Sequence, residues 1–111
     1  MVAVLVAFLG IGAYAGARLV GQRANRFRQR AQFHARRTTM FQDSIRSKTR
    51  AADDCEAYGG DRMLRIAAEY RAEVTLCEQL ADHHGRLRRK YEDAAARPWL
   101  PVAADPPEPR P

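Results

Sequence analysis

The chain has 111 residues and a formal net charge of +6. This length excludes a large hydrophobic core, and two cysteines are too few for the disulfide framework of a small secreted domain, so we expect reduced thiols. The positive charge is local, because residues 18–50 hold ten Lys/Arg against one acidic residue. Such a segment indicates a local anionic partner, lipid headgroups or nucleic acid, rather than a protein that is basic throughout.

The N-terminal segment is apolar. Residues 2–17 contain no formally charged side chain, and the apolar run continues to residue 21 if Arg18 extends its guanidinium to the headgroups. About twenty helical residues cover the roughly 30 Å of a membrane's hydrocarbon core. We therefore predict a transmembrane helix over residues 1–21. Within it, Gly12 and Gly16 form a small-xxx-small pattern that suits a helix-pairing face, although glycine is also common in membrane helices.

A cleaved signal peptide is the main alternative for this segment. The sequences AYA (13–15) and AGA (15–17) offer small-x-small cleavage patterns. A signal peptide normally begins with Lys or Arg, whereas here the positive charge follows the apolar run. Because basic flanks stay in the cytoplasm, the charge order favours an uncleaved anchor with its N-terminus outside and its C-terminal part cytoplasmic. The residues expected to set this topology and contact lipid are Arg18, Arg23, Arg26, Arg28 and Arg30.

A basic juxtamembrane helix is predicted over residues 22–57. Small and apolar residues recur every three or four positions, which places them along one helical face. This first stripe consists of Val20, Ala24, Phe27, Ala31, His34, Thr38, Phe41 and Ile45. Because Ala, His and Thr fill half of it, we expect the stripe to need a packing partner. No known nucleic-acid-binding signature accompanies the arginines, so we do not expect nucleic acid as a partner.

Residues 58–61, Tyr-Gly-Gly-Asp, predict a turn, because glycine permits positive φ at a helix end and Asp61 can cap a new first turn. An amphipathic helix is then predicted over residues 61–97, before Pro98. Its stripe is Met63, Ile66, Tyr70, Val74, Cys77, Leu80, His84, Leu87, Tyr91 and Ala94. The short turn favours an antiparallel hairpin in which Met63, Ile66 and Tyr70 cover Phe41 and Ile45. Coiled-coil-like pairing of the stripes between chains is the alternative.

Candidate chemistry is sparse. Cys55, Cys77, His83 and His84 lack the close, paired spacing of a structural zinc module. His34 and His84 lie on the two stripes, and we expect them to be packing or interface residues. We nominate no catalytic, cofactor-binding or metal-binding residue and expect neither enzyme activity nor a cofactor.

The C-terminal block is distinctive. RKYEDAAARPWLPV, residues 89–102, precedes a proline-rich end. It resembles the C-terminal end of a group of short, uncharacterised bacterial proteins, over the last quarter of the chain only. The resemblance implies no activity and suggests a helix end with a docked tail. We expect Trp99, Leu100 and Val102 to pack near Leu87 and Tyr91, and disorder from Ala103 within the tail, residues 98–111.

These observations predict an all-α, single-pass membrane-anchored interaction or scaffold protein. Its expected partners are membrane lipid and either a second copy or a partner helix. An exported, soluble helical binding module released by cleavage is the main alternative, and an accessory subunit of a membrane enzyme complex is a weaker one. The predicted helix-pairing residues are Gly12, Gly16, Phe41, Ile45, Ile66, Tyr70, Leu80 and Leu87.

Overall fold

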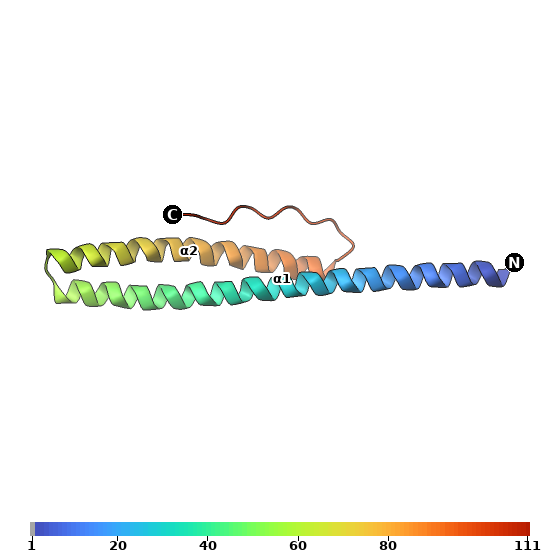
Figure 1. The fold of residues 1–111 in the computed structure, drawn as a ribbon, viewed down its shortest axis with the longest axis horizontal. Coiled ribbons are helices and arrows are strands. Elements are labelled where there is room, and N and C mark those ends of the chain that lie inside the picture. The colour runs from blue at the N-terminus through green and yellow to red at the C-terminus, as the bar shows by residue number, and fades with distance from the viewer. Residues whose placement is uncertain (1) are drawn as a thin grey trace.

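Two long helices packed as a hairpin form the protein (Figure 1). The computed structural model describes residues 2–111, with side chains from residue 7 onward. Helix α1 covers Val2–Tyr58, helix α2 covers Asp61–Ala96, and residues 97–111 form a turn and an extended tail. The radius of gyration is 23.4 Å, well above the roughly 13 Å of a compact domain of this length. The prediction of an all-α hairpin is confirmed.

Two glycines make the break between the helices. Gly59 and Gly60 have φ angles of 79° and 90°, in the left-handed region that glycine enters without the steric cost of a Cβ atom. The Gly59 N–H donates to the Cys55 carbonyl at 3.2 Å, and the Gly60 carbonyl accepts from the Leu64 N–H at 3.0 Å. Gly60 is therefore the N-cap of α2, and the capping bond expected from Asp61 is not formed. Asp61 lies in the first turn instead, where its negative charge interacts favourably with the positive end of the helix dipole.

The seam between α1 and α2 is built from the two predicted stripes. Near the end opposite the Gly-Gly turn it contains a cluster of Phe27, Ala31, Leu87 and Tyr91, against which Val102 of the tail packs. The rings of Phe27 and Tyr91 stack with their centroids 5.9 Å apart. The buried residues of the stripes are Ala24, Phe27, Ala31 and His34 on α1, and Cys77, Leu80, His84, Leu87 and Tyr91 on α2.

The register of the hairpin differs from the expected one at Phe41. Its ring stacks on His84 with centroids 5.7 Å apart, rather than under Met63, Ile66 or Tyr70. The reason is position along the chain, because Phe41 lies much farther from the Gly-Gly turn than Tyr70 does. In an antiparallel hairpin with such a short turn, residues at equal distances from the turn face each other.

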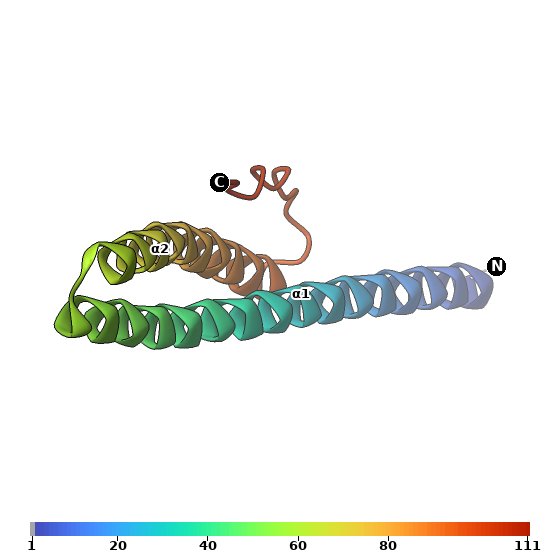
Figure 2. The same cartoon turned by 60° about the vertical axis from the view of Figure 1, so that its left-hand side comes forward.

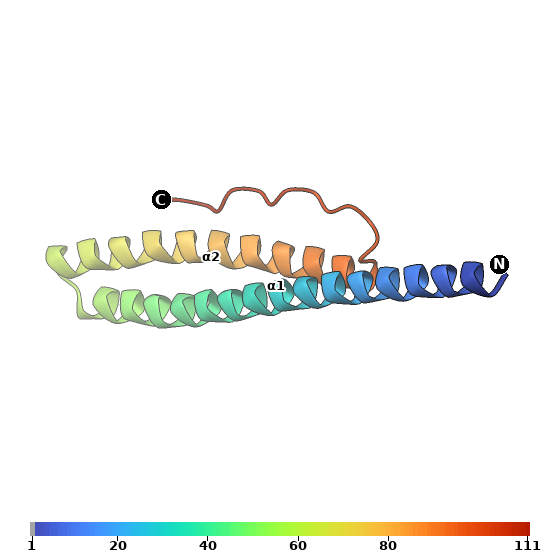
Figure 3. The same ribbon diagram turned by 45° about the vertical axis from the view of Figure 1, so that its right-hand side comes forward.

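The N-terminal part of α1 extends beyond the end of α2 in all three views (Figures 1, 2 and 3). We call residues 2–21 the arm. Its described side chains, from residue 7 onward, are exposed throughout. The large apolar ones, with their exposed fractions, are Phe8 at 71%, Leu9 at 70%, Ile11 at 67%, Tyr14 at 71% and Leu19 at 63%. No segment of α2 or the tail therefore covers this part of the arm.

The transmembrane helix predicted over residues 1–21 is not found in the part of the chain that the structure describes, where no helix is both long enough and apolar enough to cross a membrane. The described side chains of that segment run from residue 7 to residue 21. At about 1.5 Å per residue they cover about 22 Å, less than the roughly 30 Å of a hydrocarbon core. The side chains of residues 1–6 lie outside the described part.

The tail reverses direction after α2 and runs back along it (Figures 1 and 3). The Arg97 N–H donates to the Asp93 carbonyl, and the Leu100 N–H donates to the Arg97 carbonyl, both at 3.1 Å. This tight turn directs Trp99 and Leu100 outward, with 65% and 45% of their surface exposed. Trp99 therefore does not pack on the last turns of α2 as expected, whereas Leu100 lines a hollow beside Ala94 of α2 and Val102 packs against the cluster.

The tail beyond Ala103 makes specific contacts with α2, which the expectation of disorder from this residue did not include. Asp105 contacts Lys90 and Tyr91, and Glu108 contacts His84. Acidic side chains thus attach a proline-rich segment to a helix whose apolar face is already occupied by α1.

Candidate functional site

Two buried histidines meet at the centre of the seam. Nδ1 of His34 on α1 lies 2.8 Å from Nδ1 of His84 on α2, and the side chains are 9% and 4% exposed. On its other side, Nε2 of His84 lies 3.1 Å from Oε1 of Glu108 in the tail. The three residues connect both helices and the tail, and we call them the histidine junction.

Hydrogen-bond chemistry fixes the arrangement of protons in the uncharged histidine pair. An ionised carboxylate only accepts, so Glu108 requires a proton on Nε2 of His84. Nδ1 of a neutral His84 is then an acceptor, and His34 must supply the Nδ1–H that it receives. A second proton on the facing nitrogen would place two N–H groups against each other. The junction therefore accommodates this close contact only while one of the facing nitrogens is unprotonated.

The surroundings of His34 favour its neutral form. Burial lowers the pKa of His34 below its ordinary value, and the neighbouring His84 lowers it further. Of the other groups that face it, His83 on α2 and Arg30 on α1 act in the same direction, while Asp105 of the tail opposes them. The ring also stacks on Tyr91, with centroids 5.7 Å apart, which limits the access of water to the imidazole.

Asp105 forms the second attachment of the tail. Its carboxylate accepts from Lys90 Nζ at 2.6 Å and from the Tyr91 hydroxyl at 2.7 Å. Burial by itself would raise the pKa of Asp105, but the hydrogen bonds from Lys90 and Tyr91 outweigh it and hold the pKa below its ordinary value. The Tyr91 hydroxyl also accepts from Arg30 at 3.2 Å, so the tail, α2 and α1 share one polar network.

A hollow of about 570 Å³ lies between α1 and the tail, and we call it the arginine groove. Its residues are Arg23, Arg26, Phe27, Arg30, Tyr91, Val102, Ala103, Ala104 and Asp105. The three arginines follow one another along α1 at spacings of three and four, which places them on one side of the helix. The groove therefore combines a cationic wall with aromatic and small apolar residues.

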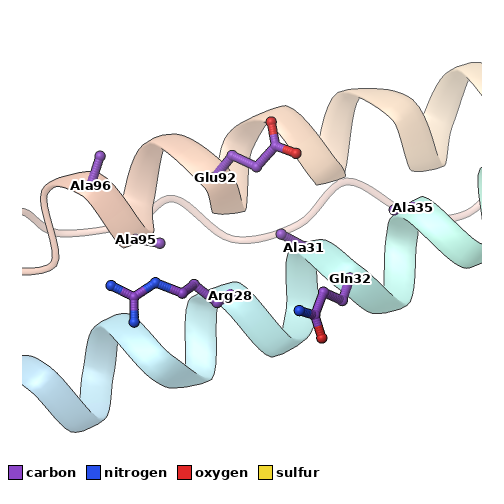
Figure 4. A pocket seen from close by; sticks show the side chains of 7 residues that line it. All are labelled: Arg28, Ala31, Gln32, Ala35, Glu92, Ala95 and Ala96. Atoms are coloured by element: carbon purple, nitrogen blue, oxygen red, sulfur yellow. The ribbon is translucent and has the colours of Figure 1, made fainter.

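A second hollow of about 430 Å³ lies between the helices beside the main cluster (Figure 4). Ala31 and Ala35 of α1 and Ala95 and Ala96 of α2 line it. The polar residues at this hollow are Arg28, Gln32 and Glu92. Small side chains on both helices leave this space at the seam.

The five arginines predicted to contact lipid take different positions. Arg23 and Arg30 line the groove and bond to Leu100 and Tyr91, respectively. Arg26 also lines the groove, Arg28 bonds to Asn25, and Arg18 is exposed on the arm. The structure thus brings three of them together at one hollow.

The predicted helix-pairing residues divide between the seam and the arm. Leu80 and Leu87 are buried, and Phe41, Ile45, Ile66 and Tyr70 are half-buried. Gly12 and Gly16 lie on the exposed arm with nothing within 4 Å of an added Cβ atom. Pairing through the two glycines therefore stays a prediction that concerns a second chain.

Both histidines lie on the predicted stripes, but stripe positions alone do not predict that His34 contacts His84. A signal was present, because His34 and His84 lie almost equally far from the Gly-Gly pair on its two sides. The contacts of Asp105 and Glu108 could not be predicted from their positions in the sequence, because they depend on how the tail turns after α2. Among the described residues, no group of three or more His, Cys, Asp or Glu side chains is arranged to hold a metal ion.

Comparisons with protein families, with curated proteins and with solved structures find no match to this chain.

Proposed function

We propose that the protein is a membrane-anchored helical scaffold, in which the arm inserts into lipid and the hairpin stands outside the bilayer as an interaction surface. The observation that carries this proposal is the uncovered arm. Full burial of one large apolar side chain contributes about 1.5–3 kcal/mol, and Phe8, Leu9, Ile11, Tyr14 and Leu19 are each more than 60% exposed. The arm therefore has a strong drive toward an apolar environment.

The distribution of these side chains favours lipid over a single partner helix. Successive residues of a helix are rotated by about 100°, so Phe8, Leu9 and Tyr14 point in three different directions around the arm. A helix that is apolar on every side suits an environment that surrounds it. The proposed anchor takes residues 2–21 together, including the uncharged residues 2–6.

The arginines after the arm support the same orientation. Residues 18–30 carry five arginines and no acidic residue, and basic flanks are retained in the cytoplasm. In this arrangement the base of the hairpin adjoins the cytoplasmic leaflet, with the Gly-Gly turn farthest from it. The partner that the hairpin binds is a second copy or another helical protein.

Vesicle flotation tests the anchor. The full-length chain is reconstituted into vesicles, extracted with alkaline carbonate and floated on a density gradient. We expect the native chain to float with the vesicles, and the double variant Leu9→Arg/Ile11→Arg to stay in the dense fraction. The controls are the single variant Leu9→Arg on the arm and Leu64→Arg, which adds the same single charge at an exposed position on α2 near the turn and should float as the native chain does. A native chain that stays in the dense fraction as a detergent-free soluble protein contradicts the proposal.

An exported soluble module is the second candidate function, and one observation favours it. The contacts of α1 with the rest of the chain involve residues from Arg23 onward. Cleavage after Ala15 or Ala17 would therefore leave the hairpin intact. The intact mass of the protein purified from cells distinguishes the two functions, because the anchor requires the N-terminal residues to be retained.

A further inference from the structure

The geometry points to the arginine groove as a binding site for the phosphate group of an anionic lipid headgroup, with Arg23, Arg26 and Arg30 as its donors. This inference rests on the proposed function, because it takes the arm as the membrane anchor. It adds a defined ligand class and a defined pocket to what is otherwise a general attraction between arginines and a charged surface.

The depth of the groove matches that of headgroups. If residues 2–21 fill the hydrocarbon core, Arg23 and Arg26 lie just beyond its edge along α1. At about 1.5 Å per residue, these positions are about 3 and 7.5 Å outside the core. The headgroup layer is about 5–8 Å thick on each side, from the difference between total and hydrocarbon thickness. Two of the three arginines therefore lie at the level of lipid phosphates. Arg30, about 13.5 Å outside the core by the same arithmetic, lines the part of the groove farther from the membrane.

Two guanidinium groups of the groove are held in place before any ligand binds. Arg23 lies 5.4 Å from the ring centroid of Phe27, and Arg30 lies 5.3 Å from that of Tyr91. Arg23 donates to the Leu100 carbonyl at 3.3 Å, and Arg30 donates to the Tyr91 hydroxyl at 3.2 Å. Each guanidinium has five N–H donors, so these bonds position the groups and leave most donors available for phosphate oxygens.

Arg26 is the third donor. Among the side chains that the structure describes, it has neither a hydrogen-bond partner nor an acidic partner. A free guanidinium beside two fixed ones can close around a phosphate in the bidentate geometry that arginine favours.

Asp105 is the one acidic group that lines the groove, and its charge is already engaged. Its carboxylate accepts from Lys90 and Tyr91. Three arginines and one aspartate leave the lining with a net charge of +2, and Lys90 offsets the aspartate from its other side. The volume of about 570 Å³ lies within the range of about 300–1,000 Å³ for small-ligand sites.

The exposed residues of the tail turn support a lipid source for the phosphate. Trp99 is 65% exposed and Leu100 is 45% exposed, and the Leu100 carbonyl is bonded to Arg23 at the membrane end of the hairpin. Tryptophan is enriched at membrane–water interfaces, where its ring meets both acyl chains and headgroups. An apolar contact of this kind fits a lipid and has no counterpart in free phosphate.

The test uses the full-length chain in non-ionic detergent micelles and the single tryptophan of the sequence as the probe. Short-chain phosphatidylglycerol, short-chain phosphatidylcholine and inorganic phosphate are titrated separately, with the Trp99 emission and native mass spectrometry as readouts. We expect saturable binding of phosphatidylglycerol at the lowest concentration. Loss of one charge-assisted bond in Arg26→Gln is expected to weaken it about tenfold. Arg62→Gln, an exposed arginine near the turn, is the matched control and should bind as the native chain does.

Three results overturn the inference: equal binding of both lipids by the native chain, unchanged binding by Arg26→Gln, or inorganic phosphate binding as tightly as phosphatidylglycerol. Vesicle flotation separates this failure from failure of the anchor. If the native chain floats but Arg26→Gln binds phosphatidylglycerol as tightly as the native chain, the anchor is supported and the binding site is refuted. A chain that does not float but binds phosphatidylglycerol in an Arg26-dependent manner retains the site and loses the anchor.

Discussion

The pH dependence of stability is the sharpest prediction of the histidine junction. His34 has a pKa below its ordinary value of 6.5 because it is buried and faces His84. Between this lowered pKa and 6.5, His34 therefore binds a proton in the unfolded chain more fully than in the folded chain. The free energy of unfolding is unaffected well above pH 6.5 and falls as the pH decreases below it.

The magnitude follows from the linkage of one proton. A difference of one bound proton changes the free energy of unfolding by about 1.4 kcal/mol per pH unit. Between pH 7.5 and pH 5.5, His34 accounts for a loss of up to about 1.4 kcal/mol, since the difference develops mainly in the last unit. Asp105 does not contribute in this window. Its pKa is lowered from an ordinary 3.8, so its contribution is present above that value and is lost at more acidic pH.

Urea denaturation followed by far-UV circular dichroism measures this loss in the full-length chain held in non-ionic micelles. The variant His34→Gln keeps a side-chain N–H that can donate to His84 but cannot titrate. We expect it to lose less stability than the native chain between pH 7.5 and pH 5.5, by an amount no larger than the limit of about 1.4 kcal/mol set by one proton. His83→Gln, which changes a histidine outside the close pair, is the control and should retain most of the native dependence, because burial and His84 lower the pKa of His34 more than His83 does. Equal losses in the native chain and in His34→Gln would refute the assignment.

Three further predictions concern packing, the polar network and the turn, and urea denaturation measures all of them. Leu87→Ala should lower the free energy of unfolding by about 2–4 kcal/mol, because Leu87 is only 4% exposed. The control Leu64→Ala, at a residue that is 49% exposed, should lower it by less than about 1 kcal/mol. Similar losses in the two variants would contradict the packing of the seam. Tyr91→Phe should lower the free energy of unfolding by about 1–2 kcal/mol, because it removes the hydroxyl that bonds to both Arg30 and Asp105. An unchanged stability would show that this network does not hold the tail. Gly60→Ala should lower the free energy of unfolding by about 1–2 kcal/mol, because a Cβ atom is strained at a φ of 90°. Gly85→Ala, inside α2, should instead raise it by about 0.5–1 kcal/mol. The opposite order of the two variants would contradict the turn geometry.

The hairpin could be predicted because its determinants are local. Paired glycines specify the turn, and residues spaced by three and four specify the faces that meet. Equal counting from Gly59 and Gly60 would also have predicted the contact between His34 and His84. For Phe41 it excludes Met63, Ile66 and Tyr70 but points to Glu78, whereas the ring stacks on His84 farther along α2. The sequence therefore contained the register, although matching the stripes alone does not reveal it.

The tail and the groove could not be predicted in the same way. Proline-rich composition says nothing about the contacts of Asp105 and Glu108, because their partners Lys90, Tyr91 and His84 are brought together only in the packed hairpin. The turn after α2 also decides that Val102 faces the seam and Trp99 faces outward. The basic segment was evident from its charge, whereas the enclosure of three arginines by the tail is a tertiary feature.

The central proposal is that the largely apolar arm holds the protein in a membrane while the hairpin folds outside it. Intact mass spectrometry of the protein recovered from carbonate-washed cell membranes tests this claim most directly. The account predicts that the protein is in the membrane pellet and retains residues 2–21. A protein recovered from the soluble fraction, or one whose chain begins after Ala15 or Ala17, would contradict it.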